Sequence, residues 1–272
     1  MSSAIDRSPE RDAYSEELPP QVKPGKLFRA ADGGVTFIQR FTPEQANLQY
    51  LGCGEFHLAP ETASHGLSTP RRESLLFQWK GQANVSVEGK THQLDPYDIL
   101  YVPSGEEFSL ANPNAEPARL IQTSAPAEQL HPVFHARFAE LSKLEGRVRR
   151  LIGKDVYLMF DVTEAADKLV AGYTFFQPYS RSWPPHNHTD QEEAYIFIKG
   201  RGAMEVFESQ ELLSFVHGVG EGDIVTIPVL NYHPVFSQQE PLEFIWCIAG
   251  ERYWVGDKNK DFMTGSADSI TT

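Results

Sequence analysis

The feature that most constrains the fold is an internal repeat of short strand-like segments, one copy in each half of the chain. Residues 98–103 (DILYVP) match residues 223–228 (DIVTIP) at an offset of 125. The segments 75–81 and 195–200 are also similar, and the Lys-Gly that ends each of them aligns at an offset of 119. Two similar offsets predict one duplicated domain with small insertions between the copies.

Short alternating apolar runs, punctuated by Gly, Pro and Asn, occur in both halves, for example at residues 34–38 and 83–87. This spacing is typical of antiparallel strands in a barrel or sandwich. We therefore expect an all-β protein of two antiparallel β-barrels of the jelly-roll type. The expected division is a polar arm (1–30), a first barrel (31–125), a helical or irregular connector (126–150) and a second barrel (151–272).

The composition argues against several classes of function. The chain has 272 residues, 40% of them hydrophobic, and a net charge of -13. Nucleic acids and anionic membranes are poor partners for so acidic a chain. No apolar run reaches the length of a membrane span and the first thirty residues hold no apolar signal core, so a cytoplasmic enzyme is expected. Cys53 and Cys247 lie in apolar runs and are expected to be buried thiols.

A candidate metal site lies in the second half. In an extended strand, residues i and i+2 point to one face, so His186 and His188 can converge on one point. Glu193 opens the next apolar run, and His233 follows a second strand. Nine histidines make a chance His-x-His pair unremarkable, but the complete string is much harder to obtain by accident. Three imidazoles and one carboxylate suit a divalent ion, with zinc as first choice and Mn, Fe, Co or Ni as alternatives.

The string resembles the two sequence motifs of cupins. His186, His188, Glu193 and Gly200 match the first motif without a gap, and Gly222, Pro228 and His233 match the second. Leu230 stands where a glycine is usual and Ser237 where an asparagine often lies, so the turn before His233 is expected to differ in shape. In the first half, Phe108 replaces the last histidine, while Leu67 and Thr69 fall near the places of the first two. The resemblance therefore implies a bicupin whose first barrel lacks metal ligands.

From about residue 25 to 262 the chain is similar to the bicupin uronate isomerases, which include 5-deoxy-glucuronate isomerase and 5-keto-4-deoxyuronate isomerase. Residues 48–52 (LQYLG), 182–188 (SWPPHNH) and 232–235 (YHPV) resemble the first enzyme. Residues 71–73 (RRE), 193–195 (EAY) and 244–246 (FIW) resemble the second. The resemblance implies a metal-dependent aldose–ketose isomerase of a deoxy-uronic acid, with 5-deoxy-glucuronate of inositol catabolism preferred. 5-Keto-4-deoxyuronate of pectin breakdown is the alternative, because the insertion usual before the glutamate of the first enzyme is missing.

The same resemblance assigns the site. His186, His188, Glu193 and His233 are implied as metal ligands, and the candidate catalytic residues are Glu193 and, from its place on the same strand face, Tyr195. A sugar carboxylate needs a cation. The candidate substrate-binding residues are Arg181, Arg201, Arg252 and Trp183. Tyr195, two positions after Glu193, is expected to point into the barrel, where positioning of the sugar, proton relay and core packing are all open to it.

Two other functions stay open at this point. An iron-dependent cupin dioxygenase would use the same four ligands in an oxygen-accessible pocket, and a sugar-binding bicupin would need no catalysis. The expected partners are a small sugar acid and further copies of the chain in a homo-oligomer. Outside the motifs, His131 and His135 are four residues apart and could bind a metal with Glu128, although packing of a connector helix on the neighbouring barrel is preferred.

Overall fold

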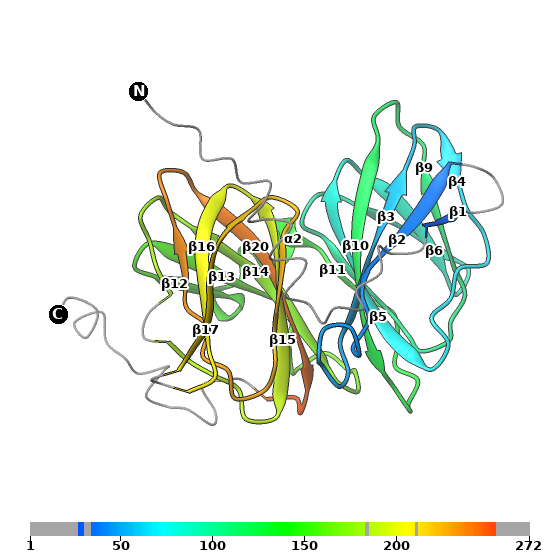
Figure 1. The fold of residues 1–272 in the computed structure, drawn as a ribbon. Helices are drawn as coiled ribbons and strands as arrows, with labels where there is room; N and C mark the ends of the chain where they lie inside the picture. The colour runs from blue at the N-terminus through cyan, green and yellow to red at the C-terminus, as the bar shows by residue number, and fades with distance from the viewer. Residues whose placement is uncertain (1–26, 30–33, 183–184, 210–211, 254–272) are drawn as a thin grey trace.

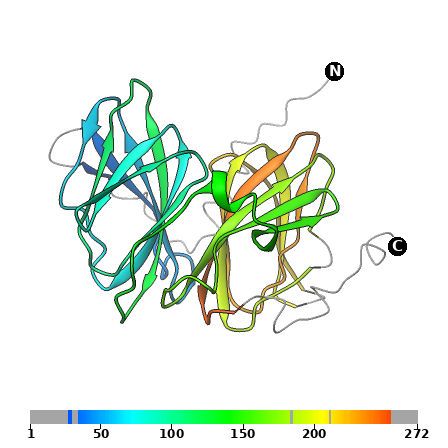
Figure 2. The same ribbon diagram turned by 180° about the vertical axis from the view of Figure 1, so that it is seen from behind.

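The computed structural model describes residues 27–29, 34–182, 185–209 and 212–253. Two β-rich halves lie side by side in it, the first blue to green and the second green to orange (Figure 1 and Figure 2). Within these residues no helix has the length and hydropathy needed to cross a membrane. The arm expected at residues 1–30 falls outside the described residues except for a three-residue strand.

The first half consists of a seven-stranded sheet and a four-stranded sheet. The larger sheet has the order β1-β2-β3-β10-β5-β8-β11 and the smaller the order β4-β9-β6-β7. Every pairing within them is antiparallel. The strands are β1 (Leu27–Arg29), β2 (Val35–Phe41), β3 (Gly52–Leu58), β4 (Thr62–Ala63), β5 (Arg72–Lys80), β6 (Ala83–Val87), β7 (Lys90–Leu94), β8 (Ile99–Val102), β9 (Phe108–Asn112), β10 (Ala118–Pro126) and β11 (Phe134–Ala136).

The second half repeats this plan with a six-stranded sheet, β12-β13-β14-β20-β15-β18, and a three-stranded sheet, β17-β16-β19. These pairings are antiparallel as well. Its strands are β12 (Val148–Leu151), β13 (Lys154–Phe160), β14 (Leu169–Phe176), β15 (Gln191–Lys199), β16 (Arg201–Phe207), β17 (Leu213–Gly220), β18 (Ile224–Ile227), β19 (Val235–Ser237) and β20 (Leu242–Gly250).

The connector is less helical than its sequence suggests. Its only α-helix in the described residues is a single turn, α2 (Phe138–Leu141), followed by the 3-10 turn η1 (Glu145–Arg147). The residues before α2 are extended instead, and β11 pairs with β8. The carboxylate of Asp98 fixes this arrangement, because it accepts the backbone N–H of Phe138 (2.8 Å) and contacts the ring of His135 (3.0 Å). His131 and His135 therefore do not share a helix face.

Three apolar cores form because each large sheet is buried on both faces. One core fills the first half and another fills the second. The third lies between the two large sheets. Strand β15 shows the alternation: Ala194 and Ile196 belong to the core between the sheets, while Tyr195 and Phe197 belong to the interior of the second half. Cys53 and Cys247 are buried free thiols in the shared core, as expected.

Two buried carboxylates also join the halves. Glu73 of β5 accepts the backbone N–H groups of residues 167, 168 and 169 at 2.7–3.0 Å. Glu192 of β15 accepts those of residues 49, 50 and 51 in the other half. Each half therefore contributes one carboxylate that binds a turn of the other half. Glu192 thereby fixes the strand that carries the next residue, Glu193.

Candidate metal centre

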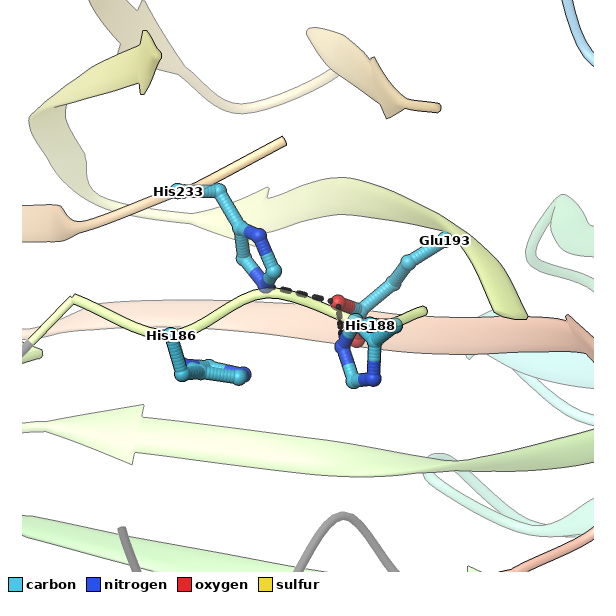
Figure 3. Close-up of side chains that lie close together, drawn as sticks. All are labelled: His186, His188, Glu193 and His233. Carbon is cyan, nitrogen blue, oxygen red and sulfur yellow. Dashed lines mark hydrogen bonds and ion pairs between the residues drawn. The ribbon is translucent and has the colours of Figure 1, made fainter. Parts of the chain in front are cut away.

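Four buried side chains from three segments meet in the second half: His186, His188, Glu193 and His233 (Figure 3). One ligand atom from each lies within 4.8 Å of the others. Glu193 is on β15 and faces the interior, as Tyr195 does. Both His186 and His188 come from the irregular segment before β15 rather than from a strand. His233 lies between β18 and β19.

Backbone hydrogen bonds align the two irregular segments. Leu230 N–H donates to the carbonyl of His188 (2.6 Å), and His233 N–H donates to that of His186 (3.3 Å). Leu230 occupies the usual glycine position and has a φ of 69°, so it takes up the left-handed conformation that glycine adopts readily. The turn before His233 therefore contains a left-handed residue at the position where cupins usually have glycine. Ser237, at the usual asparagine position, donates to the carbonyl of Gln177 (2.6 Å).

The orientation of two imidazoles follows from their outer hydrogen bonds. His188 Nδ1 lies 3.1 Å from Gln191 Oε1, and the Gln191 amide nitrogen donates to two backbone carbonyls, which fixes that oxygen as an acceptor. His233 Nδ1 lies 2.9 Å from the carbonyl of Asn231. Each Nδ1 must therefore carry a proton, as is usual where the other nitrogen binds a metal. Both Nε2 atoms then point toward Glu193 Oε2, at 3.1 and 3.0 Å.

The charge states of the site also fit a cation. Burial opposes ionisation of Glu193, but His188 and His233 outweigh it and lower the pKa of this carboxyl to about 2. Burial, followed by His233 and His188 and then by Lys154, holds the pKa of His186 well below its ordinary value. Nε2 atoms about 3 Å from a carboxylate oxygen need positive charge between them, which either protons or a metal ion can supply. A donor set of three imidazoles and one carboxylate is suited to a divalent ion.

Tyr195 lies directly beside the cluster. Its ring is 5.6 Å from the ring of His233 and 4.5 Å from that of Phe244, measured between centroids. Burial and the nearby Glu193 raise the pKa of Tyr195 well above its usual value. The phenol therefore stays protonated at neutral pH and can donate a hydrogen bond, but it is not suited to act as a base.

The arginines expected to bind substrate have other positions. Arg252 donates to the backbone carbonyls of residues 161, 164, 166 and 169, so its guanidinium holds the loop before β14. Arg181 and Arg201 are exposed. Trp183 lies outside the described residues. A cation that the structure does bring toward the cluster is Lys154 at the start of β13, which sequence reasoning missed because no motif contains it. Its charge and that of Arg149 both contribute to the lowered pKa of His186.

In the first half, the corresponding place holds hydroxyl and amide groups. Leu67 and Phe108 pair through two backbone hydrogen bonds, at 3.0 and 2.8 Å, where the second half pairs His186 with His233. Thr69 Oγ1 lies 3.0 Å from Ser74 Oγ, and Gln122 donates to both at 3.2 Å. A cavity of about 480 Å³ opens beside them. These side chains are not the ligands that a transition metal requires.

A second group of ligand-type residues, Glu73, His131 and Asp167, has a structural explanation. The Glu73 carboxylate already accepts three backbone N–H groups and the hydroxyl of Tyr101 (2.9 Å). His131 Nε2 lies 2.6 Å from Asp167 Oδ1. Because these oxygens have donors, the group needs no ion.

Comparison with known proteins agrees with this architecture. A model of the KduI/IolB family matches residues 25–263. A 4-deoxy-L-threo-5-hexosulose-uronate ketol-isomerase from Bacillus pumilus is 28% identical over 205 residues, which cover 71% of this chain and 72% of the relative. An enzyme of the same name from Opitutus terrae is 27% identical over 242 residues, covering 86% and 82%.

Solved structures confirm the expected bicupin fold. An IolB-like protein from Salmonella typhimurium has a TM-score of 0.68 at 20% identity, over 84% of this chain and 94% of that one. A variant of the oxalate decarboxylase of Bacillus subtilis has a TM-score of 0.69 at 16% identity, over 100% and 93%.

Proposed function

Because this chain belongs to the KduI/IolB family, we propose that it is a metal-dependent aldose–ketose isomerase acting on a deoxy-uronic acid. The observation that supports this most strongly is the buried cluster in which His188 and His233 direct their Nε2 atoms at one oxygen of Glu193. The names of the sequence relatives support the same reaction class. The chemistry is an internal redox change, because one carbon is oxidised as its neighbour is reduced.

The residues of the cluster have defined roles in this proposal. His186, His188, Glu193 and His233 would hold the ion. A bound divalent ion would polarise the substrate carbonyl and lower the pKa of the adjacent hydroxyl, which favours enolisation. Tyr195 keeps its proton and would donate a hydrogen bond to a substrate oxygen. The proton that leaves one carbon returns to the neighbouring carbon, so the reaction needs no external oxidant or reductant.

Two substrates are supported by different observations. Residues 182–188 and 232–235 resemble 5-deoxy-glucuronate isomerase. The relatives from Bacillus pumilus and Opitutus terrae are named for the 4-deoxy-5-keto uronate instead. Both compounds carry a carboxylate and a carbonyl beside a hydroxylated carbon, so the cluster accommodates the chemistry of either.

The deciding experiment is an assay of the purified, metal-reconstituted protein on both uronates side by side. NMR would follow the change between ketose and aldose. Turnover of one compound supports the isomerase and identifies its substrate. If neither compound reacts while the protein retains its metal, the proposal fails, and oxygen uptake would then favour a cupin dioxygenase.

A further inference from the structure

We propose that Lys154 binds the carboxylate of the sugar acid and so selects charged over neutral sugars. This inference deepens the proposed function and rests on it. It supplies the cation that a uronate needs, in place of the arginines expected from the sequence.

The strand register directs Lys154 into the second barrel. Lys154 begins β13, and the alternate residues Val156 and Leu158 both pack in the interior core of the second half. Side chains at i, i+2 and i+4 share one face of a strand. The backbone partner of Lys154 is Phe176, which belongs to the same core, and the Lys154 ammonium lies 5.5 Å from the Phe176 ring centroid.

Ser182 links Lys154 to the segments that carry the candidate metal ligands. The Lys154 ammonium donates to Ser182 Oγ (3.3 Å), and Ser182 is the last described residue before the segment that carries His186. Ser182 N–H donates to the carbonyl of Val235 (2.8 Å), two residues after His233. Ser182, which the ammonium contacts, thus leads toward the segment that carries His186 and is hydrogen-bonded to the strand that follows His233.

The ammonium has no neutralising partner in the described part of the chain. Its polar contact is the Ser182 hydroxyl, and no carboxylate of the described residues lies within 4.0 Å of the ammonium. Burial lowers the pKa of Lys154 to about 8. A half-buried cation is costly unless it is paired, and an anionic ligand would provide the pairing. At neutral pH the side chain is still mostly charged and can attract a carboxylate.

In this proposal, two parts of the second barrel have separate tasks. The cluster takes the carbonyl end of the sugar, and Lys154 takes the carboxylate end. Lys154 is therefore a substrate-binding residue. Its replacement should affect binding of charged sugars without affecting retention of the ion, because none of the four ligands is changed.

The test uses D-glucuronate and D-glucose as probes that differ in the carboxylate. Isothermal titration calorimetry on the zinc-loaded full chain would measure the affinity for each sugar. It would compare wild type with Lys154→Met, Lys154→Arg and the exposed control Lys143→Met. We expect wild type and Lys143→Met to prefer glucuronate by about tenfold or more, as a charge-assisted contact implies. Lys154→Met should lose the preference and Lys154→Arg should keep part of it. Zinc content and circular dichroism should be equal in all four.

The outcomes separate the two proposals. A glucuronate preference that survives in Lys154→Met, or that is missing in wild type, would overturn the role of Lys154. This readout does not depend on turnover, so it decides the role even if neither deoxy-uronate is isomerised. If wild type does isomerise one of them, Lys154→Met should raise KM for it by about tenfold or more. An unchanged KM would count against Lys154 while leaving the isomerase proposal intact.

Discussion

At the scale of single residues, the candidate centre is preorganised by hydrogen bonds on the outer side of its imidazoles. Gln191 holds His188 and the carbonyl of Asn231 holds His233, so both rings present Nε2 to the interior. Leu230 maintains the turn between β18 and His233 in a left-handed conformation that costs a non-glycine residue about 1–2 kcal/mol. That cost is offset by the bond from Leu230 N–H to the carbonyl of His188, which aligns the two segments.

Removal of one imidazole should separate metal binding from folding. His233→Ala is expected to abolish retention of the ion and turnover, because an incomplete ligand set binds transition metals far more weakly. Metal content after dialysis would be measured by atomic absorption, and the fold by circular dichroism. His65→Ala, at an exposed loop position, is the control. Full activity with bound metal in His233→Ala would contradict the site assignment.

At the scale of elements, strands with two buried faces place neighbouring residues in different environments. On β15, Glu192 binds the other half of the molecule while Glu193 belongs to the candidate metal-ligand cluster. A slip of one residue in the pairing of β15 with β20 would exchange the two carboxylates. In the first half, buried Glu55 on β3 similarly joins three strands, since it contacts Arg40 of β2 (2.8 Å) and Arg119 of β10 (3.0 Å).

Glu55 should make part of the stability depend on pH. Burial opposes its charge, but His57, Arg40 and Arg119 outweigh it and lower the pKa of Glu55 from 4.5 to about 2. Because the folded-state pKa is depressed, the stabilisation is fully present above about pH 4.5 and is lost as pH falls toward 2. It corresponds to about 3 kcal/mol at neutral pH.

Urea unfolding at several pH values would test this. Glu55→Gln should be less stable than wild type by up to about 3 kcal/mol at pH 7, and the gap should close as the pH falls below 4.5. The exposed Glu116→Gln is the matched control and should change stability by less than about 0.5 kcal/mol. A gap that stays constant down to pH 2.5 would argue against an electrostatic origin.

At the scale of the whole molecule, the two halves are joined by a pseudo-symmetric interface. Glu73 and Glu192 reciprocally bind turns of the opposite half. Thr123 and Cys247, at an offset of 124 residues, meet across the shared core with Oγ1 and Sγ 3.1 Å apart. Trp79 donates to the carbonyl of Ile198 across the same interface (3.1 Å). The duplicated domains therefore share one core and should unfold together.

Loss of one interface carboxylate should destabilise both halves. Glu192→Ala leaves three backbone N–H groups without their acceptor, which should cost about 3 kcal/mol in the free energy of unfolding. Glu221→Ala, which removes an exposed ion pair with Lys80, should cost less than about 1 kcal/mol. Chemical denaturation followed by tryptophan fluorescence would measure both. A loss below 1 kcal/mol in Glu192→Ala would show that the carboxylate is not an important interface contact.

The sequence alone predicted the duplicated all-β fold, the family, and the convergence of His186, His188, Glu193 and His233. The fold and the convergence of the ligands follow from local periodicity and ligand spacing, which a single chain displays directly, whereas the family follows from the resemblance of short motifs. The sequence pattern placed His186 and His188 on a strand, whereas in the structure they lie on an irregular segment. Its shape depends on hydrogen bonds to residues 230–233, more than forty positions away.

Only the tertiary structure decided which cation lies near the cluster. Arg252 was a reasonable sequence choice, but its guanidinium is used by backbone carbonyls of residues 161–169. Lys154 has no motif around it, and its position depends on the pairing of β13 with β14 and on the approach of Ser182. The sequence did not predict that Glu73 and Glu192 each bind a turn of the opposite half, because these contacts also join residues far apart in the chain. Contacts between residues distant in the chain depend on how the two sheets pack, and local sequence patterns do not encode that packing.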